Sequence, residues 1–279
     1  QPNQISATTI KTDVSCFGDA NGSIDGTITG GTAPYTITNN ITAQVTNVAT
    51  DGGNFNITGL IAGTYNYTIE DTKGCNIPLE HEIGQPTQLN LASSSSSDVS
   101  CNGGSDGSIT VEVSGGTPNY IFSINGAVTS PTSVTGDLYT FSGLSADDYT
   151  LTVTDSNNCT SDLSKIEETI DEPQAITHTI NDFELDCFGD SDGVIDGTIS
   201  GGTAPYTITN DISGTAVSVT TYGGSFSFNG LAEGNYTFTI TDANSSTNDA
   251  GCTTTATANV TQPNQISATT IKTDVSCFG

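Results

Sequence analysis

The chain has 279 residues, of which 31 are acidic and only 4 are Lys or Arg, so its formal net charge at pH 7 is -27. This balance argues against nucleic-acid binding, which depends on Lys and Arg to neutralise phosphates, and against docking on an anionic membrane surface. No apolar run is long enough to span a bilayer. Thr, Ser, Gly and Asn dominate, with Ile, Val, Tyr and Phe interleaved, which is typical of exposed β structure.

The first eighteen residues, QPNQISATTIKTDVSCFG, predict a strand that ends at a cysteine. Its apolar alternation changes phase midway, and a slip of one residue turns the other face of a strand inward. The two inward sets are Ile5, Ala7 and Thr9, then Ile10, Thr12, Val14 and Cys16. We expect a bulge or a crossing from one sheet to the other at this change. The same eighteen residues recur at 262–279, so we expect a window of a longer secreted chain with a repeat of 261 residues.

A Gly- and Asp-rich block follows each first strand. The block CFGDANGSIDGTITGGTAPY begins at Cys16, and related blocks begin at Cys101 and Cys187, each with a Tyr nineteen residues after its Cys. A second block, GLIAGTYNYTIED, also recurs twice. These repeats predict three modules and the start of a fourth: 1–84, 85–171, 172–261 and 262–279. The run Ser93–Ser97 aligns with the first strand of the second module, so we expect a weak strand there and not a linker.

Each module is predicted to be an immunoglobulin-like β-sandwich. Strand-length runs alternate apolar and polar residues between Gly, Asn, Asp and Pro turns. Tyr65, Tyr67 and Ile69 share one face of the penultimate strand, and Tyr65 follows a Leu-bearing turn, which resembles a tyrosine corner. The predicted fold is therefore all-β, a tandem array of immunoglobulin-like β-sandwich modules in an extended rod. Modules of roughly 85–90 residues have modest cores, so stapling or stacking should help them.

The signature VSCFGDANGSIDGTITGGTAPY, followed by GLIAGTYNYTIEDTKGC, resembles the SprB repeat of Bacteroidota surface proteins. The resemblance covers all three modules and the stub. That family is typified by very large gliding-motility adhesins exported through the type IX secretion system. The resemblance implies an extracellular, cell-surface protein in which this segment is the structural shaft of an adhesin or filament, used for attachment and gliding motility.

Two alternatives to that function stay open. The modules could bind polysaccharide or protein along the shaft, or the chain could belong to a purely structural filament unrelated to motility. We expect no enzyme, because near-identical repeated modules argue against a single active site and only two His are present. The expected partners are neighbouring modules of the same chain, identical chains in a filament, and an external surface or polysaccharide reached through other parts of the protein. Nucleic acid, membrane insertion and cofactors other than calcium are not expected.

The seven cysteines fall into two phases. Four end a first strand, and three follow a later loop: Cys16, Cys101, Cys187 and Cys277, then Cys75, Cys159 and Cys252. An even number per period in a secreted chain argues for disulfides. No pair of cysteines has the CxxC spacing of a zinc site.

Pairing within a module, as in Cys16 with Cys75, would have to cross the whole sandwich. Strands of about nine residues at ~3.3 Å each place the two loops at poles roughly 30 Å apart, whereas the Cα atoms of a disulfide lie within about 7 Å. We therefore favour bonds across the module junctions. These bonds are Cys16–Cys159 and Cys101–Cys252, with Cys75, Cys187 and Cys277 bonded to modules outside the sequence. Bonds within a module, free thiols and intermolecular bonds stay open as alternatives.

Acidic loop residues offer one candidate metal site. The loops GDANGSID and GDSDGVID resemble the middle of an EF-hand loop, but the first and twelfth ligand positions of the former are Phe17 and Ile28. Facing loops of the next module could complete a calcium site. The candidate ligands are Asp19, Asn21, Asp25, Asp155, Asp190, Asp192, Asp196 and Asp242. The competing interpretation is that Asn-Gly and Asp-Gly are simply turn residues.

Overall fold

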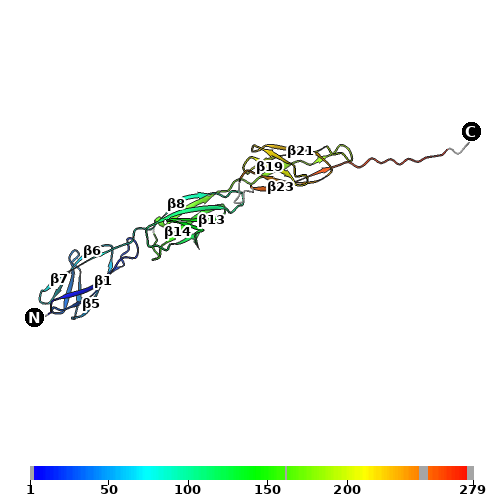
Figure 1. The fold of residues 1–279 in the computed structure, drawn as a ribbon. Coiled ribbons are helices and arrows are strands. Elements are labelled where there is room, and N and C mark those ends of the chain that lie inside the picture. The colour runs from blue at the N-terminus through cyan, green and yellow to red at the C-terminus, as the bar shows by residue number, and fades with distance from the viewer. Residues whose placement is uncertain (1–2, 161, 245–250, 275–279) are drawn as a thin grey trace, which may run out of the picture. The chain divides into compact units, whose positions relative to one another are not determined.

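The computed structural model of the chain describes residues 3–160, 162–244 and 251–274. It confirms an all-β protein with immunoglobulin-like sandwiches in tandem (Figure 1). Each sheet draws its strands from one of the three sequence modules, called module 1 (1–84), module 2 (85–171) and module 3 (172–261) below. By their contacts, the residues form two compact units. Unit 1 is Gln1–Ser96, Ile109–Phe141 and Asp148–Glu168; unit 2 is Ser97–Ser108, Ser142–Asp147 and Thr169–Gly279.

Module 1 forms two sheets, drawn in blue to cyan in Figure 1. Its strands are β1 (Ser6–Thr12), β2 (Gly22–Thr29), β3 (Tyr35–Asn39), β4 (Val45–Val48), β5 (Gly53–Leu60), β6 (Gly63–Asp71) and β7 (Asn76–Ile83). One sheet has the order β1-β2-β5 and the other the order β4-β3-β6-β7. A three-strand sheet that faces a four-strand sheet through such crossovers is an immunoglobulin-like sandwich.

Alternation along the strands builds the core of module 1. Ile24 and Ile28 on β2 point inward and are fully buried. Gly26 lies between them in the same phase, opposite Phe55 of β5. A Cβ on Gly26 would lie 2.5 Å from the Phe55 ring, so glycine is required for this close approach. The alternation predicted from sequence therefore selects the inward face, and one glycine makes room for the largest side chain on it.

Tyrosine hydroxyls fix two kinds of turn. The Tyr65 hydroxyl donates to the Ile61 carbonyl at 3.0 Å, in the way the predicted tyrosine corner requires. The Tyr35 hydroxyl donates to the Gly30 carbonyl at 2.5 Å, and Gly30 has a φ of 74°, which favours glycine. The second bond recurs in the other modules as Tyr120–Gly115 and Tyr206–Gly201. The repeated Gly pair and the Tyr that follows it are thus one structural motif.

Module 2 also forms two sheets, with the orders β12-β13-β9-β8 and β11-β10-β14-β15. Its elements are β8 (Asn90–Ser97), β9 (Gly107–Ser114), β10 (Ile121–Ile124), β11 (Ala127–Thr129), β12 (Ser133–Thr135), β13 (Leu138–Leu144), β14 (Asp147–Thr154), the 3-10 turn η1 (Asp162–Ser164) and β15 (Lys165–Ile170). The serine run lies in β8 as a largely exposed strand, as expected. Nowhere in the described ranges is a helix long and apolar enough to cross a membrane.

Module 3 repeats the design with sheets of three and five strands, in the orders β16-β18-β21 and β17-β23-β22-β19-β20. Its strands are β16 (Thr177–Ile180), β17 (Phe183–Glu184), β18 (Gly193–Ser200), β19 (Tyr206–Asn210), β20 (Ala216–Val219), β21 (Ser225–Leu231), β22 (Gly234–Thr241) and β23 (Thr253–Thr261). Its core is built around the fully buried Tyr206 and Phe238. The close agreement of the sequences of modules 1 and 3 is matched by the same order of their strands, apart from β17, which extends the larger sheet of module 3.

The first strand changes sheets, but later than the sequence predicts. In module 3 the first strand is paired with β18 only along β16. The short β17 that follows pairs in parallel with β23 of the other sheet. In module 1, β1 stays paired with β2 as far as Thr12, and the crossing is marked by one bond from the Val14 amide to the Gly84 carbonyl, 3.1 Å. Ile10, predicted to point inward, is therefore 75% exposed. Continuous pairing keeps the strand in phase to Thr12, and Val14 is the residue that turns in.

Candidate functional site

A buried aspartate organises the loop that precedes the last strand of each module, called the socket loop. In module 2 this loop runs from Asp155 to Cys159. The fully buried Asp155 carboxylate accepts three backbone N–H groups, from Thr117 at 2.8 Å and from Asn157 and Cys159 at 2.9 Å each. A buried carboxylate requires such partners, since charge without them is costly in a protein interior. The aspartate therefore fixes the position of the cysteine.

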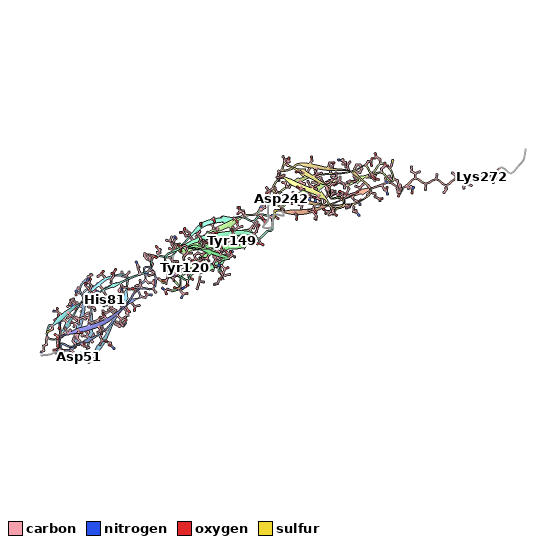
Figure 2. All side chains as sticks on the ribbon, viewed as in Figure 1. Asp51, His81, Tyr120, Tyr149, Asp242 and Lys272 are labelled. Carbon is pink, nitrogen blue, oxygen red and sulfur yellow. A yellow bond between two sulfur atoms is a disulfide. The ribbon has the colours of Figure 1, made fainter. Side chains whose placement is uncertain are left out.

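The same frame recurs in the other two modules. In module 1 the Asp71 carboxylate accepts from the amides of Thr32, Lys73 and Cys75, each at 2.9 Å. Burial raises the pKa of Asp71, but these backbone N–H groups outweigh it and hold the pKa below its ordinary value. In module 3 the acceptor is Asp242, labelled in Figure 2. It accepts from Thr203 at 2.8 Å and from Asn244 and Cys252 at 3.0 Å.

The loop after the first strand of each module, called the plug loop, is also held in one conformation. In module 1 it runs from Ser15 to Asp19. The Ser15 amide donates to the Asn21 side chain at 3.1 Å, and the Asp19 amide donates to the Cys16 carbonyl at 3.2 Å. The Gly18 amide donates to the side chain of Gln85, the residue that starts module 2, at 2.9 Å. The start of the next module thus helps to shape this loop.

Module 2 carries an equivalent plug loop, Ser100 to Gly104. The Ser100 amide and hydroxyl both donate to Asp106, and these two bonds hold the pKa of Asp106 below its ordinary value. The Gly104 amide donates to the Cys101 carbonyl at 2.9 Å. The Gly103 amide donates to Glu172, the first residue of module 3, at 2.7 Å. Plug loops therefore share a frame, although their side chains differ.

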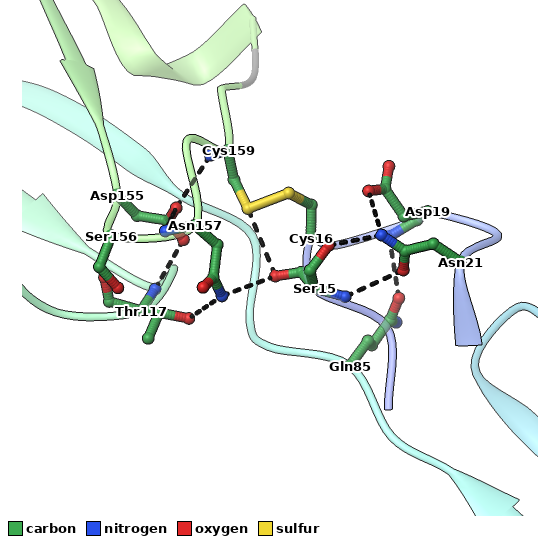
Figure 3. The surroundings of a disulfide bond; sticks show 11 residues. Ser15, Cys16, Asp19, Asn21, Gln85, Thr117, Asp155, Ser156, Asn157 and Cys159 are labelled. Atoms are coloured by element: carbon green, nitrogen blue, oxygen red, sulfur yellow. Dashed lines mark hydrogen bonds between the residues drawn. A yellow bond between two sulfur atoms is a disulfide. The ribbon is translucent and has the colours of Figure 1, made fainter. Parts of the chain in front are cut away.

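The plug loop of module 1 and the socket loop of module 2 form the first joint, which lies within unit 1 (Figure 3). Cys16 and Cys159 are joined by a disulfide with a Cα–Cα distance of 5.5 Å. The Asn157 side-chain amide donates to the Ser15 carbonyl at 3.1 Å and to the Thr117 hydroxyl at the same distance. The joint thus combines one covalent bond with a hydrogen bond across a sequence separation of 142 residues.

The second joint, within unit 2, repeats this arrangement. Cys101 and Cys252 are joined by a disulfide with a Cα–Cα distance of 5.4 Å. The Asn244 side-chain amide donates to the Ser100 carbonyl at 2.7 Å. The residue two positions after the socket aspartate is therefore asparagine in both joints, with the same role. Both bonded pairs are those favoured by the strand-length argument.

Two further cysteines of the described residues carry no disulfide bond. Cys75 lies in the socket loop of module 1 and Cys187 in the plug loop of module 3, and both are exposed, free thiols. Cys277 lies outside the described residues. Bonds from these three cysteines to further modules stay a prediction.

Of the candidate calcium ligands, Asp19 and Asn21 lie together, with the Asn21 side-chain amide donating to the Asp19 carboxylate at 3.4 Å. Among the described residues, no group of three or more His, Cys, Asp or Glu side chains is placed to hold a metal ion. Asp155 and Asp242 hold the socket frames, and Asn21 holds the plug loop. Asp25 and Asp196 accept hydrogen bonds from Asn56 and Asn181. The acidic candidates do not form such a group among the described residues: Asp19, Asp25, Asp155, Asp190, Asp192, Asp196 and Asp242. Calcium binding stays a prediction without a preformed site.

The sequence interpretation missed the residues that support each joint. Asn157 and Asn244 were not singled out, because each resembles ordinary turn chemistry. The available signal was positional: an aspartate, a cysteine after it, and an asparagine two residues beyond the aspartate in modules 2 and 3. In module 1 that position is Lys73.

Comparison with solved structures finds arrays of immunoglobulin and related domains. The complex of Dpr2 Ig1-Ig2 with DIP-Theta Ig1-Ig3 matches at 8% identity over 94% of this chain and 100% of that chain, with a TM-score of 0.36. Invasin, a bacterial integrin-binding protein, matches at 15% identity over 93% and 60%, with a TM-score of 0.33. The fibronectin domains FN1-FN3 of chicken CNTN1 match at 12% over 93% and 99%, with a TM-score of 0.24. TM-scores this low carry no argument about the chain.

Comparison with families is more direct. The model of the SprB repeat matches once in each module, at residues 8–40, 93–129 and 184–211. No protein with a curated description matches the chain. Each matched segment contains a first-strand cysteine and its plug loop, the elements that build the joints. The chain therefore contains three SprB repeats, one in each module.

Proposed function

We propose that the chain is a non-catalytic structural segment of an extracellular adhesin, in which it forms part of a shaft whose successive modules are stapled by disulfides. The observation that carries this proposal is the repeated joint. Two joints of the same design use the same socket frame, the same asparagine contact and a disulfide. A joint repeated in this way serves connection.

The joint stiffens the shaft because each junction has two covalent connections. Between modules 1 and 2 the polypeptide passes from Gly84 to Gln85, and the Cys16–Cys159 bond provides a second connection. A single flexible linker lets two domains reorient freely. A second crosslink removes most of this freedom, and the bond from Asn157 to the Ser15 carbonyl opposes what is left.

The overlap of the two disulfides also limits how far the chain can be stretched. The bonds span 143 and 151 residues, and their loops overlap between Cys101 and Cys159. Under tension the load would pass from Cys16 to Cys159, back through module 2 to Cys101, and across to Cys252. This path contains roughly 100 residues and extends to about 350 Å, whereas the reduced chain of 279 residues would extend to about 980 Å.

The proposed extracellular location rests on the disulfides and on the family resemblance. Disulfides persist in oxidising environments outside the cytoplasm. The surface is strongly acidic, with a net charge of -27, which favours solubility and repulsion between neighbouring shafts. We infer that the shaft holds a distal part of the protein away from the cell for attachment to surfaces. Gliding motility and export by the type IX secretion system stay predictions from the family resemblance.

Stretching single molecules between their two ends tests the shaft proposal. We expect the oxidised chain to stop at about 350 Å and the same chain after reduction to reach about 980 Å. The variant C101S/C252S should extend roughly 120 Å further than the oxidised chain, because the load then passes along the polypeptide from Cys159 to the end of the chain and is no longer transferred to Cys252 by a disulfide. The variant C75S/C187S is the matched control and should behave as the unmodified chain. Extension of the oxidised chain to its full length would contradict the proposal.

Ligand binding along the shaft is a second candidate, favoured by one repeated feature. Modules 1 and 3 each have a groove on the three-strand sheet, of about 510 Å³ and about 520 Å³. The first is lined by Thr8, Ile10, Asp25, Asn54 and Asn56, among others. Hydroxyl and amide groups beside an apolar side chain suit a polysaccharide. Binding of surface polysaccharides by the chain, lost in the N54A/N56A variant, would support this function, and absence of binding would contradict it.

A further inference from the structure

Lys73 stands out among the four basic residues of the chain. Lys11, Lys165 and Lys272 each form an ion pair with an acidic residue two positions later, at 3.0, 2.9 and 3.0 Å. All four lysines are described, and Lys73 alone has no ion-pair partner in the described part of the chain. It lies in the socket loop of module 1, at the position where modules 2 and 3 have the asparagine that contacts the incoming plug loop.

The plug loop of module 3 differs from the other two plug loops by one acidic residue. Asp186 stands directly before Cys187, where the other two plug loops have Ser15 and Ser100. The residue six positions later is Asp192, so module 3 has two carboxyl groups where module 2 has the hydroxyl of Ser100 facing Asp106. Asp186 is exposed, and its carboxylate has no hydrogen-bond partner among the described residues. A negative charge is thus presented beside a free thiol.

Both loops are nevertheless built like those in the two formed joints. In the socket of module 1, the Asp71 carboxylate holds the amides of Lys73 and Cys75 at 2.9 Å, the distance found for Asp155 in the first joint. In the plug of module 3, the Gly189 amide donates to Gln262 at 2.7 Å, as Gly18 does to Gln85.

The turn of the module 3 plug loop is also closed, by a bond from the Asp190 amide to the Cys187 carbonyl at 3.4 Å. Its neighbour Leu185 is 2% exposed and its amide donates to the Thr261 carbonyl at 2.8 Å, as Val14 does to Gly84 in module 1. Each loop therefore has the frame of a formed joint but lacks its partner. Cys75 and Cys187 are exposed and free.

We propose that these two loops are the halves of a third kind of joint, which links successive copies of the 261-residue unit. In it, the plug loop of module 3 in one copy enters the socket loop of module 1 in the next copy of the same polypeptide. Cys187 bonds to Cys75 of the next copy, and the Lys73 ammonium pairs with the Asp186 carboxylate in place of the contact made by asparagine. The charge pair marks the boundary between copies and discriminates it from the two neutral joints inside a copy.

Formation of the bond balances with an external oxidant. The two thiols give up two protons and two electrons, and a low-molecular-weight disulfide accepts them to become two thiols. In thiol–disulfide exchange, one cysteine thiolate attacks the small disulfide and releases a small thiol. The thiolate of the other cysteine then attacks the mixed disulfide and releases the second small thiol.

The inference rests on the proposed stapled shaft, and a tandem protein tests it separately. Residues 1–261 are followed by a full copy of residues 1–279, which preserves the local sequence because residues 262–279 repeat residues 1–18. C75S in the first copy, with C187S and C277S in the second, leaves two free cysteines, Cys187 of the first copy and Cys75 of the second. After equilibration in oxidised and reduced glutathione, peptide mapping without reduction should find Cys187 bonded to Cys75 of the second copy.

The outcomes separate the two proposals. If Cys16–Cys159 and Cys101–Cys252 bonds form but Cys187 stays a thiol or bonds to another molecule, this inference fails and the stapled shaft stands. If none of these bonds forms, the shaft proposal fails as well. A mixture of separate single copies is the comparison arm, and a Cys75–Cys187 bond that forms there as completely as in the tandem protein would overturn the assignment to one polypeptide.

Charge reversal tests the marking of the boundary. K73D in the second copy should lower the equilibrium constant for closing this bond roughly three- to tenfold at low salt, because repulsion replaces an exposed ion pair. D186K in the first copy should restore it in the double variant, and salt should shrink both effects. K73N, which copies the other sockets, should cost only roughly two- to fivefold. The Cys16–Cys159 equilibrium is the internal control. No change in K73D, or no rescue in the double variant, would overturn the charge pairing.

Discussion

Removing the Cys16–Cys159 bond should destabilise module 2 by an amount that the structure defines. When module 2 unfolds alone, Cys16 remains in folded module 1, where Val14 is held to Gly84 by a backbone bond of 3.1 Å. The disulfide then closes a loop from Gly84 to Cys159, roughly 75 residues, and not the 143 residues that separate the two cysteines. Closing such a loop lowers the entropy of the unfolded chain by about 15 cal/mol/K, or about 4.5 kcal/mol at 25 °C.

Hydrogen exchange measures this change where it arises. The amides of β9 (Gly107–Ser114) and β14 (Asp147–Thr154) lie in the core strands of module 2 and exchange when the module opens. In the background C101S/C252S, where no second disulfide shortens the loop, adding C16S/C159S should lower their protection roughly thousandfold, the equivalent of about 4.5 kcal/mol. C75S/C187S removes the same number of cysteines and should leave protection unchanged. A loss of less than tenfold in C16S/C159S would refute the loop-closure reasoning.

Three further predictions concern the acidic loop residues. D155A should destabilise module 2 by roughly 2–4 kcal/mol in urea unfolding, because three backbone N–H groups lose a charged acceptor; D155N keeps an acceptor oxygen and should cost less, and equal losses would contradict this. The pKa of Asp71 lies below the ordinary value of about 3.9, so its contribution to stability is present above that pH and is lost as pH falls through the lowered value. Carboxyl NMR titration checks this, and an ordinary or raised pKa would contradict it. A calcium site predicts a higher melting temperature in excess calcium than in chelator, and equal temperatures would remove that prediction.

The repeat made most of the fold predictable from sequence. Constant spacings, such as the nineteen residues from Cys16 to Tyr35, depend on turns and bonds that every module needs. Apolar alternation fixed the inward faces of strands paired on both sides, such as β2. It failed at the first strand, where Ile10 is exposed, because hydrophobicity alone does not reveal how far a strand stays paired before it changes sheets.

The candidate site was predictable only in part for a different reason. Strand length argued against pairing within a module, and the expected placement of the two loops at opposite poles favoured Cys16 with Cys159. The supporting groups could not be found this way, because a carboxylate that binds backbone amides has the same sequence signature as one that binds calcium. Asp155 was taken as a candidate ligand, but in the structure it is the centre of the socket frame. Similarly, the role of Asn157 depends on a partner 142 residues away.

Peptide mapping of the full chain without reduction tests the central claim most directly. Free thiols are blocked before digestion so that exchange cannot rearrange the bonds. The account predicts two crosslinked peptide pairs, Cys16 with Cys159 and Cys101 with Cys252, with Cys75 blocked as a free thiol. A crosslink between Cys16 and Cys75 would mean that each module closes on itself, and it would contradict the stapled shaft.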